Sequence, residues 1–293
     1  MRFFEKRPMA MIVLGVVGIS LSSIFVKYSA APAAVTAAWR LLWTVALMTP
    51  VVWGSGTVRR ELLGVNGKIA VLSALSGLFL AVHFVLWFES LNQTSVASST
   101  TIVCTEVIWV CLGYRMFLGG RIPGRAALAI AVTLAGSVLI AFADSGSQGH
   151  LWGDVLALLA AVDVAGYTLI GRVVRAKAST TVYTYLVYTA CALALVLTCA
   201  FQGLVLTAYG SSPVFVGLAL AMFSTILGHS IFSWCLKYFS PAFVSASKLC
   251  EPVGAAALAA VLFAQIPTAL QLLGGGLILG GVLWYSRMEG ETT

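Results

Sequence analysis

Apolar runs separated by short polar connections extend along the whole chain. Each run has close to the twenty residues that a helix needs to cross about 30 Å of hydrocarbon. The runs lack the strict alternation of barrel strands. Since the connections are only a few residues long, neighbouring helices should be antiparallel. The pattern predicts an all-α membrane protein of ten transmembrane helices, at 9–28, 33–53, 68–90, 94–117, 123–143, 151–174, 180–200, 212–236, 241–264 and 267–288.

Composition agrees with a lipid environment. Of the 293 residues, 60% are hydrophobic and 9% are charged, whereas soluble domains carry about 25% charged residues. The basic start, Met1 to Pro8, is followed by an apolar stretch that is longer than a signal-peptide core, and nothing soluble follows it. We therefore expect a retained first helix and no soluble domain.

The basic residues orient the bundle. With the N-terminus in the cytoplasm, the predicted helices place fourteen of the seventeen Lys and Arg residues on the cytoplasmic side: Arg2, Lys6, Arg7, Arg59, Arg60, Lys68, Arg115, Arg121, Arg125, Arg172, Arg175, Lys177, Lys237 and Arg287. Lys27 alone falls on the opposite side, and Arg40 and Lys248 fall within helices. The positive-inside rule then predicts an N-in, C-in, multi-pass protein of the cell inner (plasma) membrane. The same rule explains the net charge of +7 without a nucleic-acid partner.

The chain also contains an internal repeat. The segment from His83 to Glu106 aligns with the segment from His229 to Glu251, and the alignment pairs His83 with His229 and, after one deletion, Glu106 with Glu251. Five helices in each half is an odd number, so the second unit must enter the membrane inverted. We expect two inverted five-helix repeats, 1–145 and 146–293, an architecture typical of secondary transporters. Gene duplication also builds channels and enzymes.

Both halves resemble EamA-type transporters of the drug/metabolite transporter superfamily. The resemblance rests on Ser240 to Ser245, Glu251 to Ala255 and Leu272 to Val282, with counterparts from Thr94 to Ala97 and from Leu134 to Gly136. It implies a ten-helix inverted-repeat fold and export of amino acids or other metabolites; YddG-like aromatic amino acid exporters are one branch. The chain departs from the family at Gly120 and Gln265, where members often carry an acidic residue.

Five charged residues fall inside predicted spans, where ions are costly unless they are paired or hydrated, so each is a candidate for substrate binding or coupling. They are Arg40, Glu106, Asp163, Lys248 and Glu251. Lys248 and Glu251 are three residues apart and should meet on one helix face, just before the helix-disturbing Pro252. Arg40 is expected to pair with a carboxylate, or else to meet an anionic group of the substrate. The alternative role for these charges is an internal salt bridge that holds helices together.

Uncharged candidates complete the site. His83 and His229 either relay protons or hydrogen-bond a neighbouring helix. Trp87 and Trp234 follow them on the same helices and either receive an apolar substrate group or fill the core. Gly276 and Gly280 form a small-residue pair that would let the last helix approach a neighbour, within the bundle or across a dimer.

These features predict a secondary transporter that exports a small metabolite, most simply an amino acid, by alternating access. Neither HExxH nor GxSxG occurs in the chain, so no enzymatic activity is expected. No catalytic residue, metal site or cofactor is predicted, and the partners are a small-molecule substrate and the lipid bilayer. A membrane channel or an intramembrane enzyme is the alternative. The chain is expected to be a monomer or a homodimer.

Overall fold

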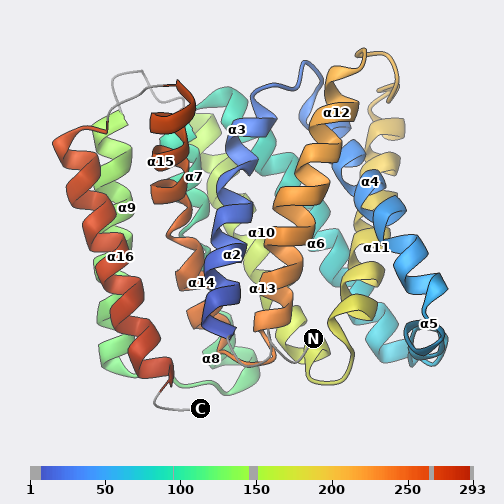
Figure 1. The fold of residues 1–293 in the computed structure, drawn as a ribbon, viewed down its shortest axis with the longest axis horizontal. Helices are drawn as coiled ribbons and strands as arrows, with labels where there is room; N and C mark the ends of the chain where they lie inside the picture. The colour runs from blue at the N-terminus through green and yellow to red at the C-terminus, as the bar shows by residue number, and fades with distance from the viewer. Residues whose placement is uncertain (1–7, 95, 145–150, 264–266, 291–293) are drawn as a thin grey trace.

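The computed structural model describes residues 8–94, 96–144, 151–263 and 267–290, and within these ranges its regular elements are helices without strands. The basic residues Arg2, Lys6 and Arg7, and the family departure Gln265, lie outside the described residues. Figure 1 shows the helices side by side, with the start of α2 and the end of α16 at the same end of the bundle. Their bounds, in chain order, are α2 Pro8–Ser20, α3 Ser22–Val26, α4 Ala33–Gly54, α5 Gly56–Leu63, α6 Gly67–Gln93, α7 Val96–Val103, α8 Glu106–Leu118, α9 Gly124–Asp144, α10 Leu151–Arg175, α11 Thr180–Phe201, α12 Ser212–Ala219, the π-helix η1 Leu220–His229, α13 Ser230–Cys235, α14 Pro241–Lys248, α15 Glu251–Phe263 and α16 Ala269–Gly290.

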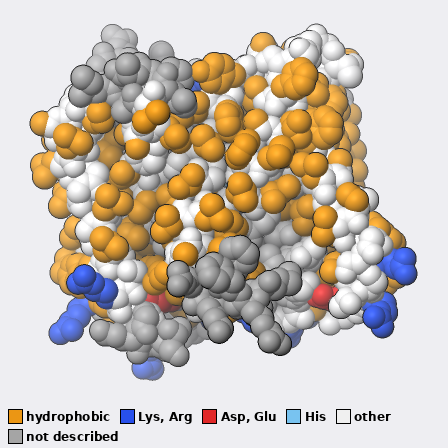
Figure 2. Space-filling view, in the orientation of Figure 1, with side chains coloured by type: hydrophobic (Ala, Val, Ile, Leu, Met, Phe, Trp, Pro, Cys, Tyr) orange, Lys and Arg blue, Asp and Glu red, His pale blue; other side chains and the backbone are white. Residues whose placement is uncertain are grey.

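Eight stretches of the described chain are long and apolar enough to cross a membrane, and each coincides with a predicted span. The two other predicted spans fall on α9 and on the α14–α15 pair. A helical, multi-pass membrane protein is therefore confirmed, while the count of ten spans stays a prediction. The outer surface agrees: in Figure 2 hydrophobic side chains cover the height of the bundle, and Lys and Arg gather mainly at the end where α2 begins and α16 ends.

Two helices are broken at corresponding places. α7 ends at Val103 and α8 begins at Glu106, while α14 ends at Lys248 and α15 begins at Glu251. At each break the backbone forms a hydrogen bond between residues three apart, as in a 3₁₀ turn. Thr105 N donates to the Ile102 carbonyl at 3.0 Å, and Cys250 N donates to the Ser247 carbonyl at 3.2 Å. The second break precedes Pro252, as predicted. The first break has no proline and was not predicted.

A π-helix interrupts the predicted span 212–236. η1 runs from Leu220 to His229, between α12 and α13, where an ordinary α-helix was expected. α2 packs directly against η1. A Cβ on Gly18 would lie 2.7 Å from the Phe223 carbonyl oxygen and 2.9 Å from Gly228 N, so the backbones of α2 and η1 touch. Wide turns of this kind displace the side chains that follow them; here η1 ends on the candidate residue His229.

Close glycine contacts join α9 to α16. A Cβ on Gly136 would lie 2.5 Å from the Gly274 carbonyl oxygen, and a Cβ on Gly274 would lie 2.6 Å from the Gly136 carbonyl oxygen. The prediction had assigned a close approach to Gly276 and Gly280, either within the bundle or across a dimer. Within the described chain neither has a neighbouring atom within 4 Å of its added Cβ, and their contact with a second copy stays a prediction. The small-residue stripe of α16 that meets α9 is thus turned around the helix from the predicted one.

Candidate functional site

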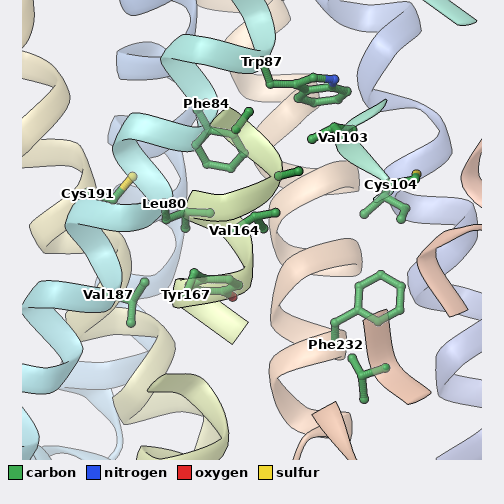
Figure 3. Packing of buried hydrophobic residues seen from close by; sticks show 14 of the residues in the cluster. Leu80, Phe84, Trp87, Val103, Cys104, Val164, Tyr167, Val187, Cys191 and Phe232 are labelled. Carbon is green, nitrogen blue, oxygen red and sulfur yellow. The ribbon is translucent and has the colours of Figure 1, made fainter. Parts of the chain in front are cut away.

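A cavity of about 40 Å³ lies between α2, α3, α6, α7, α8, α10, η1, α14 and α15. Six of the nine candidate residues line it, from both halves of the chain: His83, Trp87, Glu106, His229, Lys248 and Glu251. Figure 3 shows Trp87, Val103, Cys104 and Val164 in the surrounding apolar packing. The remaining wall residues are Ile19, Ser22, Val103, Cys104 and Val164. The structure therefore brings most of the predicted site to one place.

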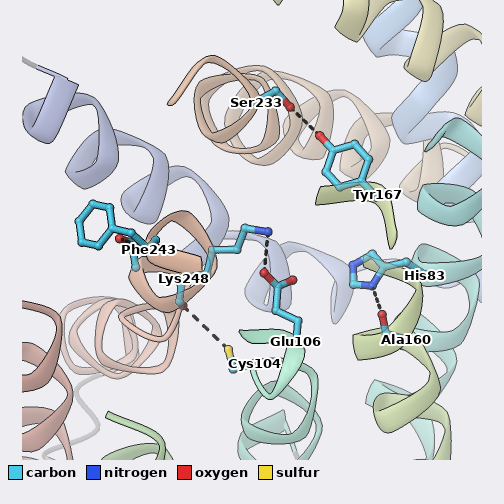
Figure 4. Close-up of polar contacts among 9 residues, drawn as sticks. His83, Cys104, Glu106, Ala160, Tyr167, Ser233, Phe243 and Lys248 are labelled. Atoms are coloured by element: carbon cyan, nitrogen blue, oxygen red, sulfur yellow. Dashed lines mark hydrogen bonds and ion pairs between the residues drawn. The ribbon is translucent and has the colours of Figure 1, made fainter. Parts of the chain in front are cut away.

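An ion pair joins the two helix breaks at this cavity. Lys248 Nζ lies 2.9 Å from Glu106 Oε1, and the two residues are only 7% and 4% exposed (Figure 4). Lys248 is the last residue of α14 and Glu106 the first of α8. The expected meeting of Lys248 with Glu251 is not what the structure shows, because the helix ends between them and α15 restarts at Glu251. Each residue is the counter-ion of the other, so neither charge is buried unpaired, which would be strongly destabilising.

Glu251 also lines the cavity, but one of its carboxylate oxygens is unpartnered in the described chain. Its side chain is 7% exposed, and its Oε1 has no hydrogen-bond partner in the described part of the chain. Its backbone carbonyl accepts a hydrogen bond from Ser20 Oγ at 3.4 Å, which ties the start of α15 to α2. Of the two carboxylates at the helix breaks, Glu106 is thus engaged by a cation and Glu251 retains an open acceptor.

The two histidines have unequal surroundings. His83 Nδ1 donates a hydrogen bond to the Ala160 carbonyl in α10 at 2.9 Å (Figure 4). The ring of His83 stacks on that of Trp87, with centroids 6.0 Å apart. The bond to Ala160 is the hydrogen bond to a neighbouring helix that the sequence left open for the histidines. His229 packs edge-on against Phe84 at 5.4 Å, and its Nδ1 lacks a hydrogen bond among the described residues.

Arg40 is fully buried beside the cavity but does not line it. Its Nε donates to Thr225 Oγ1 at 2.7 Å, its Nη1 donates to Ser22 Oγ at 3.3 Å, and its guanidinium carbon lies 4.1 Å from the centre of the Phe84 ring. Over the described residues no carboxylate comes within ion-pair distance of Arg40. The expected carboxylate partner was wrong; hydroxyls and an aromatic face take its place.

Asp163 and Trp234 are not brought to the central cavity. Asp163 is half-buried on α10, next to the lining residue Val164. The ring of Trp234 packs against that of Tyr238, with centroids 4.4 Å apart and planes tilted by 42°. Trp234 lines a separate, open pocket of about 590 Å³ with the basic residues Arg175, Lys177 and Lys237. Trp234 therefore belongs to the end of the bundle where α10 ends and not to its centre.

Small polar residues completed the site without having been predicted. Ser22 both lines the cavity and holds Arg40, and Thr225 holds Arg40 from η1. Tyr167 Oη and Ser233 Oγ lie 2.7 Å apart and join α10 to α13 (Figure 4). Their signal in the sequence is a serine or threonine inside an apolar run, a feature that the sequence prediction did not include.

Comparisons with known proteins show what the chain is similar to. Residues 151–287 match the model of the EamA-like transporter family. No curated protein matches the chain. One solved structure, described only as "Crystal structure of protein", is similar over 98% of this chain and 99% of its own, with a TM-score of 0.76 and 18% sequence identity. At that identity the likeness shows a shared fold alone.

Proposed function

We propose that the chain is a secondary transporter that exports a small metabolite, an amino acid or a related compound, by alternating access. The proposal starts from the match of residues 151–287 to the model of the EamA-like transporter family. The observation that carries the proposal is that buried charges of both halves meet at one central cavity, as Lys248, Glu106 and Glu251 do. Ions at this depth persist where they are paired or hydrated, and transporters use such places for substrates.

The proposed inverted repeats, 1–145 and 146–293, have support in the way the halves are built. Glu106 and Glu251, paired by the alignment, each start the second part of a broken helix. His83 and His229, also paired, both line the cavity. Corresponding residues of inverted halves meet at the pseudo-two-fold axis, which is where substrate sites of such transporters lie.

Two further contacts support alternating access. Lys27, directly after α3, donates from Nζ to the Leu91 carbonyl in α6 at 2.5 Å. Arg172, in the last turn of α10, donates to the Leu236 carbonyl directly after α13. Each contact joins the first helix of a half to the third helix of that half, and we call them the Lys27 latch and the Arg172 latch.

The latches close opposite ends of one interface. α2 and α3 pack with η1 and α13 to form one side, and α6 packs with α10 to form the other. Each latch crosses between these sides, and the cavity lies between them, lined by Ser22 and His229 from one side and by His83 and Trp87 from the other. With both latches made, the cavity of about 40 Å³ is far below the 300–1,000 Å³ typical of ligand sites. Transport would need one latch to open at a time.

The membrane and orientation are part of the proposal. We place the chain in the cell inner membrane with both termini cytoplasmic, because the described Lys and Arg residues gather mainly at the end where α2 begins and α16 ends (Figure 2). A monomer carries the whole central cavity, and a homodimer is compatible with it.

Flux through proteoliposomes tests the proposal. Purified protein should move at least one member of an amino-acid panel with saturable kinetics, and the panel is measured with and without a proton gradient. Flux that rises linearly with concentration would indicate a channel. Absence of flux for every amino acid and related amine or acid in the panel would refute the proposed substrate class.

A further inference from the structure

We infer that the central cavity is a subsite for a primary ammonium group, held by Glu251 and His229 next to the indole N–H of Trp87, and that a substrate carboxylate is not required for binding. This inference rests on the proposed transport function and names the substrate class of its site. It follows from which buried atoms at the cavity are already bonded and which are not.

Three wall residues have unused hydrogen-bonding atoms. Glu251 Oε1, His229 Nδ1 and Trp87 Nε1 make no hydrogen bond within the described chain, although these residues are only 7%, 8% and 4% exposed. Buried polar atoms are bonded in the great majority of cases, so three open ones around a single cavity indicate a ligand or solvent. They come from α15, η1 and α6, which are separate helices.

The other polar wall groups are already engaged. Lys248 and Glu106 neutralise each other at 2.9 Å, and His83 donates to the Ala160 carbonyl. Arg40 Nη2 is also unpartnered in the described residues, but Arg40 does not line the cavity. No cation that lines the cavity is therefore free to receive an anionic group, whereas a carboxylate oxygen is free to receive a cationic one.

The open atoms match the donors of an ammonium group. A primary ammonium carries three N–H donors and no acceptor. Glu251 Oε1 accepts one of them, and His229 Nδ1 accepts a second when the neutral ring carries its proton on Nε2. The Trp87 N–H, a donor only, would serve an acceptor atom adjacent to the amine. Phosphates and carboxylates would instead meet the Glu251 carboxylate and be repelled.

The size of the cavity agrees with a head group. Its volume is about 40 Å³, and one water needs roughly 10–15 Å³ by the same measure. The space thus holds an ammonium group and little more in the closed form. The rest of the substrate would occupy space that opens when a latch releases, against the apolar wall residues Ile19, Val103 and Val164.

Three probes that share a phenylethyl skeleton test the inference by titration calorimetry on the purified full-length chain. Phenethylamine keeps only the amine, 3-phenylpropionate keeps only the carboxylate, and phenylalanine keeps both. We expect phenethylamine and phenylalanine to bind and to compete, and 3-phenylpropionate not to displace either. Tighter binding of 3-phenylpropionate than of phenethylamine, or no binding of phenethylamine, would overturn the subsite, and this comparison needs no variant.

Variants then place the amine. Glu251→Gln should weaken phenethylamine binding about ten- to a hundredfold, as expected for a lost hydrogen bond between charged groups. Glu89→Gln is the matched control, because Glu89 is half-buried on α6, accepts from Gln93 and lies away from the cavity wall. Unchanged binding by a folded Glu251→Gln protein would refute the assignment.

The proposed transport function and the proposed subsite can be refuted independently of each other. Saturable flux of a metabolite without an amine, together with no phenethylamine binding, would keep the transporter and refute the subsite. Phenethylamine binding that Glu251→Gln weakens, with no flux of any panel compound, would keep the subsite and refute transport.

Discussion

Lys248 Nζ lies 2.9 Å from Glu106 Oε1, and through this pair the end of α14 is joined to the start of α8 across the two halves of the chain. The two residues are separated by 142 positions in the sequence. Each residue of the pair stands where a helix breaks at the cavity. The energetic role of the pair can be separated from any transport role.

Glu106→Gln should destabilise the protein by about 3–5 kcal/mol, because it leaves the buried Lys248 ammonium without its counter-ion. The double variant Glu106→Gln/Lys248→Met should recover most of this loss, since no buried charge remains unpaired. Thermal unfolding in detergent measures both. A double variant less stable than the single one would show that the pair stabilises the fold by more than mutual neutralisation.

Lys248→Met and Glu251→Gln should each reduce flux of the transported substrate while folded protein remains in the membrane. The reason is that both residues line the cavity at which buried charges of the two halves meet. Proteoliposome uptake, normalised to the amount of inserted protein, gives the measurement. Normal transport by both variants would leave these charges a purely structural role.

The two latches should have opposite effects on access to the cavity. Cys104 lines it and is 3% exposed, so it reports access once the other five cysteines are replaced. Lys27→Met should speed labelling of Cys104 from the outside, and Arg172→Met from the inside. Lys27→Met loses one hydrogen bond from a charged donor, so the expected change is about tenfold. Arg172→Met loses two, to the Leu236 and Phe239 carbonyls, so its change should be at least as large.

Membrane-impermeant thiol reagents added to one side of right-side-out or inside-out vesicles measure this. Both variants speeding labelling from the same side would contradict latches at opposite ends.

Gly274→Ala should destabilise the bundle, whereas Gly276→Ala should not. An added Cβ at Gly274 meets the Gly136 carbonyl at 2.6 Å, while the same group at Gly276 meets nothing within 4 Å. Alanine gains up to about 1 kcal/mol over glycine in a helix interior, so the second variant should be neutral or slightly more stable. Comparison of their melting temperatures provides the test, and equal melting temperatures would contradict the α9–α16 contact.

Reporter fusions test the orientation. A fusion after Gly64 should report from the cytoplasm and a fusion after Ser147 from the outside, because an odd number of predicted spans, three in all, separates these positions. Alkaline phosphatase and fluorescent protein fusions give complementary signals on the two sides. The same location for both would refute the predicted topology.

The sequence alone determined the class of the protein and the region of its site. The length and composition of an apolar run are local properties, so the helical segments followed from them with few errors of position. The repeat identified His83 with His229 and Glu106 with Glu251, and all four line one cavity. A charged residue in an apolar run is costly to bury wherever the helix lies. The sequence therefore also predicted that these charged residues need partners or hydration.

The tertiary structure decided which partner each charge has. Lys248 meets Glu106 instead of the nearby Glu251, and Arg40 meets hydroxyls and Phe84 instead of a carboxylate. Such choices depend on how helices distant in sequence are rotated and shifted against one another. The break at Cys104 and the π-helix η1 change those rotations, and neither has a proline to mark it. Pairing across helices is set by packing of the whole bundle, which no single segment of the sequence encodes.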